Sequence, residues 1–311
     1  MNENFKRKRD AIDQIRTIYW FEGIRISTGV DTAYAVERLV EPEGFKLNKA
    51  GTAFHRNKWI SYRSGRHTPR AALVTRANKL VAGSDKELNH VLWKVLADSS
   101  NVVRDGPTWL RQLAPGLQLV VFSEDGELHP HRGQRFLSKI ERRAGLDSLA
   151  CLTILLKMDV ALGVYEQVWR LAGSIFRVLL MLGEHFTKRG LAEAIFEVYV
   201  VKIFHFSKWN GERFYIEKYN FSFWAGLLYQ TAVRGVSDKG RTSSWSEKVH
   251  QMNRILGGKL GLDLKFSLDP LIGPDLDLGP LSEATQRKLC TSILIKKRCM
   301  ERIYPGNTFD V

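Results

Sequence analysis

The most informative segment of the chain reads Phe54-His55-Arg56-Asn57-Lys58-Trp59-Ile60-Ser61-Tyr62-Arg63-Ser64-Gly65-Arg66-His67-Thr68-Pro69. On a helix, the apolar residues Phe54, Trp59 and Tyr62 can face inward while the polar quartet between Phe54 and Trp59 faces outward. We therefore predict a helix over residues 52–64. Its buried aromatic face and its exposed basic, amide-bearing surface have the chemistry that suits a DNA groove.

The end of this predicted helix is also marked. Gly65 favours a helix stop and Pro69 favours a restart of the chain. Phe54, Trp59, Tyr62, Gly65 and Pro69 together resemble the recognition helix of the Cro/C1 (lambda-repressor-like) helix-turn-helix family. The resemblance implies that four residues read base edges: His55, Arg56, Asn57 and Lys58.

The resemblance covers about the first quarter of the chain, and two features differ from the family pattern. Arg63 stands where the family has an acidic residue. Glu41–Ala53 separates the second and third predicted helices, which the family joins by a turn of three or four residues. The same pattern also fits an ordinary amphipathic helix followed by a Gly-Pro turn. Residues 41–53 carry Lys46 and Lys49, and they can form either a small wing that adds phosphate contacts or a solvent-exposed loop.

Composition favours a polyanionic partner. The chain has 311 residues with a net charge of +14 and a pI near 9.7, which indicates nucleic acid first and an anionic membrane surface second. A basic cluster, Lys6 to Arg9, precedes the first predicted helix and can act as an arm on DNA or as a frayed terminus. The predicted nucleic-acid-binding residues are His55, Arg56, Asn57, Lys58, Arg63, Arg66, Lys6, Arg7, Lys8, Arg9, Lys46 and Lys49.

Other classes of protein find less support in the sequence. The three cysteines are widely spaced and form no CxxC motif, so we expect neither a disulfide framework nor a structural zinc site. We expect no signal peptide and no membrane span, and hence a cytoplasmic protein without a membrane partner. His129 and His131 form an H-x-H pair without a second ligand cluster, so we expect no metal site and no cofactor.

The rest of the chain predicts a mainly α protein with at most a small hairpin. Apolar residues from Leu146 onward recur at helical spacing, as in a bundle core. The turn signal Asn210-Gly211 among aromatic residues predicts the hairpin. The polar segment 123–133 is our candidate linker, so we predict a helix-turn-helix-containing domain over residues 1–122 and a helical oligomerisation, partner or effector domain over residues 134–311.

From the sequence, we expect a sequence-specific DNA-binding protein that regulates transcription, with double-stranded DNA as partner and the 52–64 helix as reader. We expect it to be a homodimer or a subunit of a larger complex. The alternative is a non-enzymatic basic subunit of a nucleoprotein complex that binds DNA or RNA without sequence preference. No phosphate-binding loop or nucleophile elbow is present, so the sequence favours a non-enzymatic role, with a nuclease as a third possibility.

Overall fold

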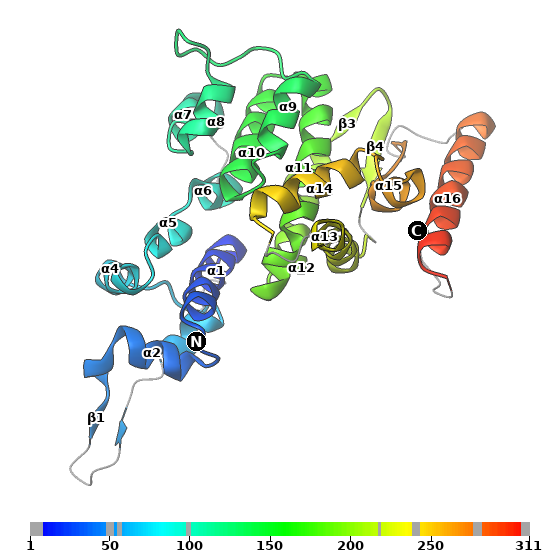
Figure 1. Ribbon diagram of the computed structural model, residues 1–311. Helices are drawn as coiled ribbons and strands as arrows, with labels where there is room; N and C mark the ends of the chain where they lie inside the picture. The colour runs from blue at the N-terminus through cyan, green and yellow to red at the C-terminus, as the bar shows by residue number, and fades with distance from the viewer. Residues whose placement is uncertain are drawn as a thin grey trace, which may run out of the picture. The chain divides into compact units, whose positions relative to one another are not determined.

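The computed structural model (Figure 1) describes residues 9–47, 53–54, 58–97, 101–216, 219–237, 243–275 and 282–305. Most of these residues lie in helices, and the strands form one two-stranded and one three-stranded antiparallel sheet. The expected mainly α class is therefore confirmed. By backbone contacts the chain divides into an N-terminal unit, residues 1–98 with 188–191, and a C-terminal unit, residues 99–187 with 192–311.

Helices and one short hairpin make up the N-terminal unit. In chain order its elements are α1 (Ala11–Thr28), α2 (Ala33–Val40), η1 (Pro42–Gly44), β1 (Lys46–Leu47), β2 (Ala53–Phe54), α3 (Lys58–Arg63), α4 (Ala71–Leu80), α5 (Ser84–Leu88) and α6 (Val91–Ala97).

Local capping signals explain where the first two helices begin and end. The Asp10 side chain accepts a hydrogen bond from the Ile12 N–H at 2.7 Å and caps α1, which ends at Gly29 in the left-handed conformation. The Thr32 hydroxyl accepts from the Ala35 N–H at 3.1 Å and caps α2.

The core of this unit gathers around α1. Trp20, Phe21 and Ile24 of α1 pack with apolar residues of α2, α3, α4 and α5. Trp59 and Tyr62 of α3 belong to this core, so the expected inward aromatic face is confirmed for these two residues. Burial of large aromatic side chains from several helices is the main source of stability in such a small unit.

The predicted helix over residues 52–64 is shorter in the structure. Ala53–Phe54 forms strand β2, which pairs antiparallel with Lys46–Leu47, and the helix α3 begins at Lys58. The 41–53 segment thus contains paired strands, and its phosphate contacts stay a prediction. Strand formation depends on pairing with a partner segment, and the periodicity of one segment does not report this pairing. The apolar spacing therefore extended the predicted helix too far towards the N-terminus.

The C-terminal unit is a larger helical assembly with a small sheet. Its elements are α7 (Val102–Leu110), α8 (Pro115–Val121), α9 (Gln134–Glu141), α10 (Leu146–Ala161), α11 (Tyr165–Lys188), α12 (Ala192–Lys202), η2 (Phe204–Phe206), β3 (Lys208–Trp209), β4 (Glu212–Tyr215), α13 (Phe221–Ser237), α14 (Trp245–Leu256), α15 (Leu262–Leu268), β5 (Leu271–Pro274) and α16 (Glu283–Ile303). None of the described helices is both long and apolar enough to span a membrane.

The unit boundary differs from the predicted one. Helix α7 packs against α10, where Gly106 permits a close approach, because a Cβ there would lie 2.6 Å from Met158 Sδ. Residues 101–122 therefore belong to the C-terminal unit. The proposed linker 123–133 also lies within that unit, and its Arg132 is buried in an ion pair with Asp159 of α10.

The predicted hairpin at Asn210-Gly211 is present. Lys208–Trp209 pairs with Glu212–Arg213, and both turn residues have positive φ, 54° and 73°. Strand β5 adds to β4 in antiparallel register, with Phe214 opposite Ile272. The sequence gives no local signal for β5, because its partner strand lies far away in the chain.

Candidate nucleic-acid interface

Helix α3 is held by its aromatic face. The Trp59 and Trp20 rings stack with centroids 5.6 Å apart, and Tyr62 meets both rings edge-on. Burial raises the pKa of Tyr62, and the carboxylates of Glu41 and Glu37 raise it further, while Arg70 acts in the opposite direction. The helix therefore has one defined orientation on α1, set by three rings.

The beginning of α3 is tied to the end of α2 by one carboxylate. Glu41 accepts a hydrogen bond from Trp59 Nε1 at 2.9 Å and forms an ion pair with Lys58 Nζ at 2.6 Å. Arg76 of α4 lies 3.7 Å from the same carboxylate and also pairs with Glu43. Lys58 was expected to be free for base reading. Instead its charge is neutralised within the unit.

The other three residues expected to read bases, His55, Arg56 and Asn57, lie outside the described residues. Lys49 also lies outside them. Lys46 is in strand β1, which pairs with β2, the strand that precedes α3 in the chain. The structure thus places part of the expected interface and leaves the base-reading quartet as a prediction from the sequence.

The end of α3 is a glycine-terminated turn. The Arg66 N–H donates to the Ser61 carbonyl at 2.8 Å, and the Gly65 N–H donates to the Tyr62 carbonyl at 3.0 Å. These two hydrogen bonds form a Schellman motif. Gly65 has φ +66°, and a Cβ there would lie 2.9 Å from the Gln14 carbonyl oxygen. Both conformation and close packing on α1 therefore require glycine at this position.

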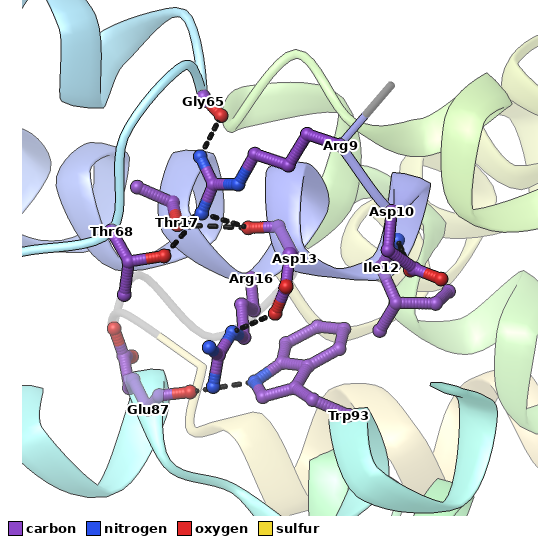
Figure 2. Close-up of polar contacts among 10 residues, drawn as sticks. All are labelled: Arg9, Asp10, Ile12, Asp13, Arg16, Thr17, Gly65, Thr68, Glu87 and Trp93. Carbon is purple, nitrogen blue, oxygen red and sulfur yellow. Dashed lines mark hydrogen bonds and ion pairs between the residues drawn. The ribbon is translucent and has the colours of Figure 1, made fainter. Parts of the chain in front are cut away.

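Arg9 fixes this turn to α1 (Figure 2). Its guanidinium donates to the Gly65 carbonyl, to the Thr68 hydroxyl and, at 3.1 and 3.0 Å, to the Asp13 carbonyl and the Thr17 hydroxyl. Burial lowers the pKa of Arg9, with Asp13 acting in the opposite direction.

The expected contact of Arg9 with DNA stays a prediction, and the structure gives this side chain another role. Its donors are already used inside the unit, where they hold the turn. The rest of the predicted arm, Lys6, Arg7 and Lys8, lies outside the described residues.

An exposed group of cationic residues lies on and after the end of α3. We call it the basic turn, and it consists of Arg63, Arg66, His67 and Arg70. All four side chains are exposed, and within the described part of the chain none has an ion-pair partner. Buried Pro69 and the Arg9 contacts hold the backbone beneath them. The arrangement presents several positive charges from one rigid backbone segment, which suits phosphate binding.

Sequence reasoning found Arg63 and Arg66, but it missed Glu41, His67 and Arg70 and the contacts that Arg9 makes within the unit. Glu41 and Arg9 act through partners that are distant in the chain, 18 residues from Glu41 to Trp59 and 56 from Arg9 to Gly65. Arg70 was detectable, because Arg63, Arg66, His67 and Arg70 form one run of cationic residues around Gly65 and Pro69.

His129 and His131 do not belong to a metal centre in the described chain. Among all the residues that the structure describes, no group of three or more His, Cys, Asp or Glu side chains is placed to hold a metal ion.

The chain was compared with family models, curated proteins and solved structures, and nothing matched in any of the three. The case for a function therefore depends on the residues themselves.

Proposed function

We propose that the N-terminal unit binds double-stranded DNA with sequence preference and that the protein regulates transcription. Its basic turn would contact phosphates, and the residues that precede Trp59 would read base edges. The observation that carries the proposal is the basic turn, whose exposed cations are fixed on a braced helix end.

The distribution of ion pairs supports this assignment. Lys58 and Arg76 are neutralised by Glu41 and Glu43, whereas Arg63, Arg66 and Arg70 lack a carboxylate partner within the described residues. Unpaired arginines on a rigid backbone keep their charge and their five donors for a ligand. Phosphate oxygens along a duplex are the anions that best match several arginines on one short segment.

The chemistry of the side chains assigns phosphate binding and base reading to different residues. Contacts from the basic turn would set affinity and its salt dependence, without sequence information. Arg56 and Asn57 have the donor and acceptor patterns that distinguish guanine and adenine in the major groove. Their role comes from the resemblance to the Cro/C1 family. The C-terminal unit would supply dimerisation, partner binding or response to a signal.

The test begins with selection of bound oligonucleotides from a random pool by the full chain at fixed salt. An enriched palindrome would support both sequence preference and a homodimer. Gel-shift competition then compares the selected duplex with a scrambled one. Arg56→Ala with Asn57→Ala should reduce discrimination between them by about tenfold or more while the circular dichroism spectrum stays unchanged.

A second double variant tests the basic turn. Arg63→Gln with Arg66→Gln should weaken binding to both duplexes equally and reduce the slope of log affinity against log salt by about 2. The matched control is Lys86→Gln with Lys94→Gln, which removes the same charge from exposed positions on α5 and α6. Equal effects of the two doubles would refute the assignment of the basic turn. Binding without an enriched sequence would favour a basic subunit of a nucleoprotein complex.

A further inference from the structure

A cavity of about 730 Å³ lies within the C-terminal unit. Residues of α9, α11, β4, β5, α15 and α16 line it. This volume falls in the range of pockets that hold small organic ligands. The cavity is separate from the basic turn, since all its lining residues belong to the C-terminal unit and the basic turn belongs to the N-terminal unit.

One part of the cavity wall is flat and aromatic. The Trp169 and Phe214 rings stack with centroids 4.4 Å apart and planes within 7° of parallel. Phe266, Ile272 and Ile295 also line the cavity, and each exposes more than two fifths of its surface, at 42%, 41% and 49%. Exposed apolar side chains that converge on one cavity gain free energy when an apolar ligand covers them.

The acidic residues of the cavity are already neutralised. Glu141 is buried and accepts hydrogen bonds from the Ser174 hydroxyl at 2.7 Å and from Arg177 Nε at 3.1 Å. Asp269 forms an ion pair with Lys265. These carboxylates therefore have no free charge with which to bind a cation.

Two cations of the cavity wall, Lys296 and Arg170, form no ion pair with the two carboxylates of the lining. Lys296 is buried and donates to the carbonyls of Phe266 and Ser267 at 3.1 and 3.0 Å and also to that of Asp269. The Asp269 carboxylate also interacts favourably with its charge. Arg170 is half exposed and pairs with Glu166, one turn earlier on α11. Four cationic side chains and two carboxylates line the cavity, and Arg177 and Lys265 pair with the two carboxylates. The lining therefore keeps a net positive charge, which attracts an anion.

We propose that this cavity binds a small organic anion with a flat apolar body. The body would lie against the Trp169–Phe214 wall and the exposed side chains of Phe266, Ile272 and Ile295. The acidic group would be held by the net positive charge of the lining, to which Arg170 and Lys296 contribute. The proposal does not depend on DNA binding, and it assigns a ligand class to the unit for which the sequence indicated no function.

The probe for the test is 1-anilinonaphthalene-8-sulfonate, an aromatic sulfonate, and its uncharged comparison is N-phenyl-1-naphthylamine. Titration of the folded full chain should show one saturable site for the sulfonate, with energy transfer from tryptophan, because Trp169 lies in the wall. The uncharged compound should bind at least about tenfold more weakly.

Two variants perturb the site at exposed positions, where folding should survive. Arg170→Gln should weaken the sulfonate about fivefold and change the uncharged compound less than twofold. Ile272→Glu should weaken the sulfonate more than tenfold by placing a carboxylate in the apolar wall. The matched controls are Arg104→Gln, an exposed arginine paired with neighbouring Asp105, and Leu119→Glu, an exposed leucine on α8. Both controls should bind as the parent protein does.

Several results would overturn the proposal. One is the absence of a saturable sulfonate site in the parent protein, and another is equal affinity for the two compounds. Sulfonate binding that is unchanged in both Arg170→Gln and Ile272→Glu would also exclude this cavity. Equal binding of the uncharged compound would instead indicate an apolar surface that a protein segment covers.

Discussion

Gly65→Ala tests the braced turn most directly, because a single methyl group is added at the contact between the turn and α1. Gly65 has φ +66°, and the added Cβ would lie 2.9 Å from the Gln14 carbonyl oxygen and 3.1 Å from Gln14 Cα. Both neighbouring atoms belong to helix backbone, which cannot move aside as a flexible side chain can. The turn must therefore shift away from α1 or change its conformation.

The expected cost has two parts. A left-handed conformation costs a residue with a Cβ about 1–2 kcal/mol relative to glycine. Overpacking against backbone adds about 1–3 kcal/mol. Gly29→Ala isolates the first part, because Gly29 has φ +69° and no atom within 4 Å of the position of an added Cβ. We therefore expect Gly65→Ala to destabilise the N-terminal unit by about 1–3 kcal/mol more than Gly29→Ala does.

Hydrogen exchange measured by mass spectrometry on the full chain can resolve this difference. Peptides that cover α1 and α3 should exchange faster in Gly65→Ala than in Gly29→Ala, by about thirtyfold for a difference of 2 kcal/mol. Peptides from α10, in the C-terminal unit, are the internal reference. Equal protection of α1 and α3 in the two variants would refute the inferred close packing of the turn.

Three other perturbations follow from particular contacts. Glu41→Ala leaves the buried Trp59 Nε1 without its acceptor and should lower the free energy of unfolding by about 1–3 kcal/mol. Glu41→Gln keeps an acceptor and should lower it less. Hydrogen exchange of α3 peptides measures both changes. Arg132→Met leaves the buried Asp159 carboxylate uncompensated and should cost about 3–5 kcal/mol in thermal unfolding, with most of it recovered in the double variant Arg132→Met, Asp159→Leu. Burial lowers the pKa of Lys296 from 10.5 to about 8, with Asp269 acting in the opposite direction. The NMR resonance of its Cε should therefore titrate near pH 8. A midpoint above pH 10 would contradict this prediction. Because the unfolded chain keeps that proton up to pH 10.5, the contribution of Lys296 to the unfolding free energy should rise as the pH increases from about 8 to 10.5.

The features that were predictable from the sequence are local in the chain. Helical periodicity from Leu146 onward indicated the helices that include α10, and apolar spacing indicated the buried Trp59 and Tyr62 of α3. Asn210-Gly211 marked the hairpin because a two-residue turn with two positive φ angles favours that pair. Each of these signals depends on residues within a few positions of one another.

The features that were missed depend on partners far apart in the chain. Arg9 belongs to a basic run that suggests a solvated arm, yet its acceptor at Gly65 lies 56 residues away. Segment 123–133 is polar like a linker, yet Arg132 is buried by a carboxylate 27 residues later. The energy of a buried ion pair comes from tertiary surroundings, which composition does not report.

The position of α3 in this structure does not depend on a tight connection from α2. A turn of three or four residues would fix two helices through the backbone, but here the hairpin strands β1 and β2 lie between them. Side-chain contacts serve this purpose instead. Glu41 pairs with Lys58 and accepts a hydrogen bond from Trp59 Nε1, and the Trp59 ring also stacks on Trp20 of α1. Arg9 and Gly65 then hold its end against α1. Because these contacts join α3 to α1 and to the end of α2, they set the orientation of the basic turn without a short backbone connection.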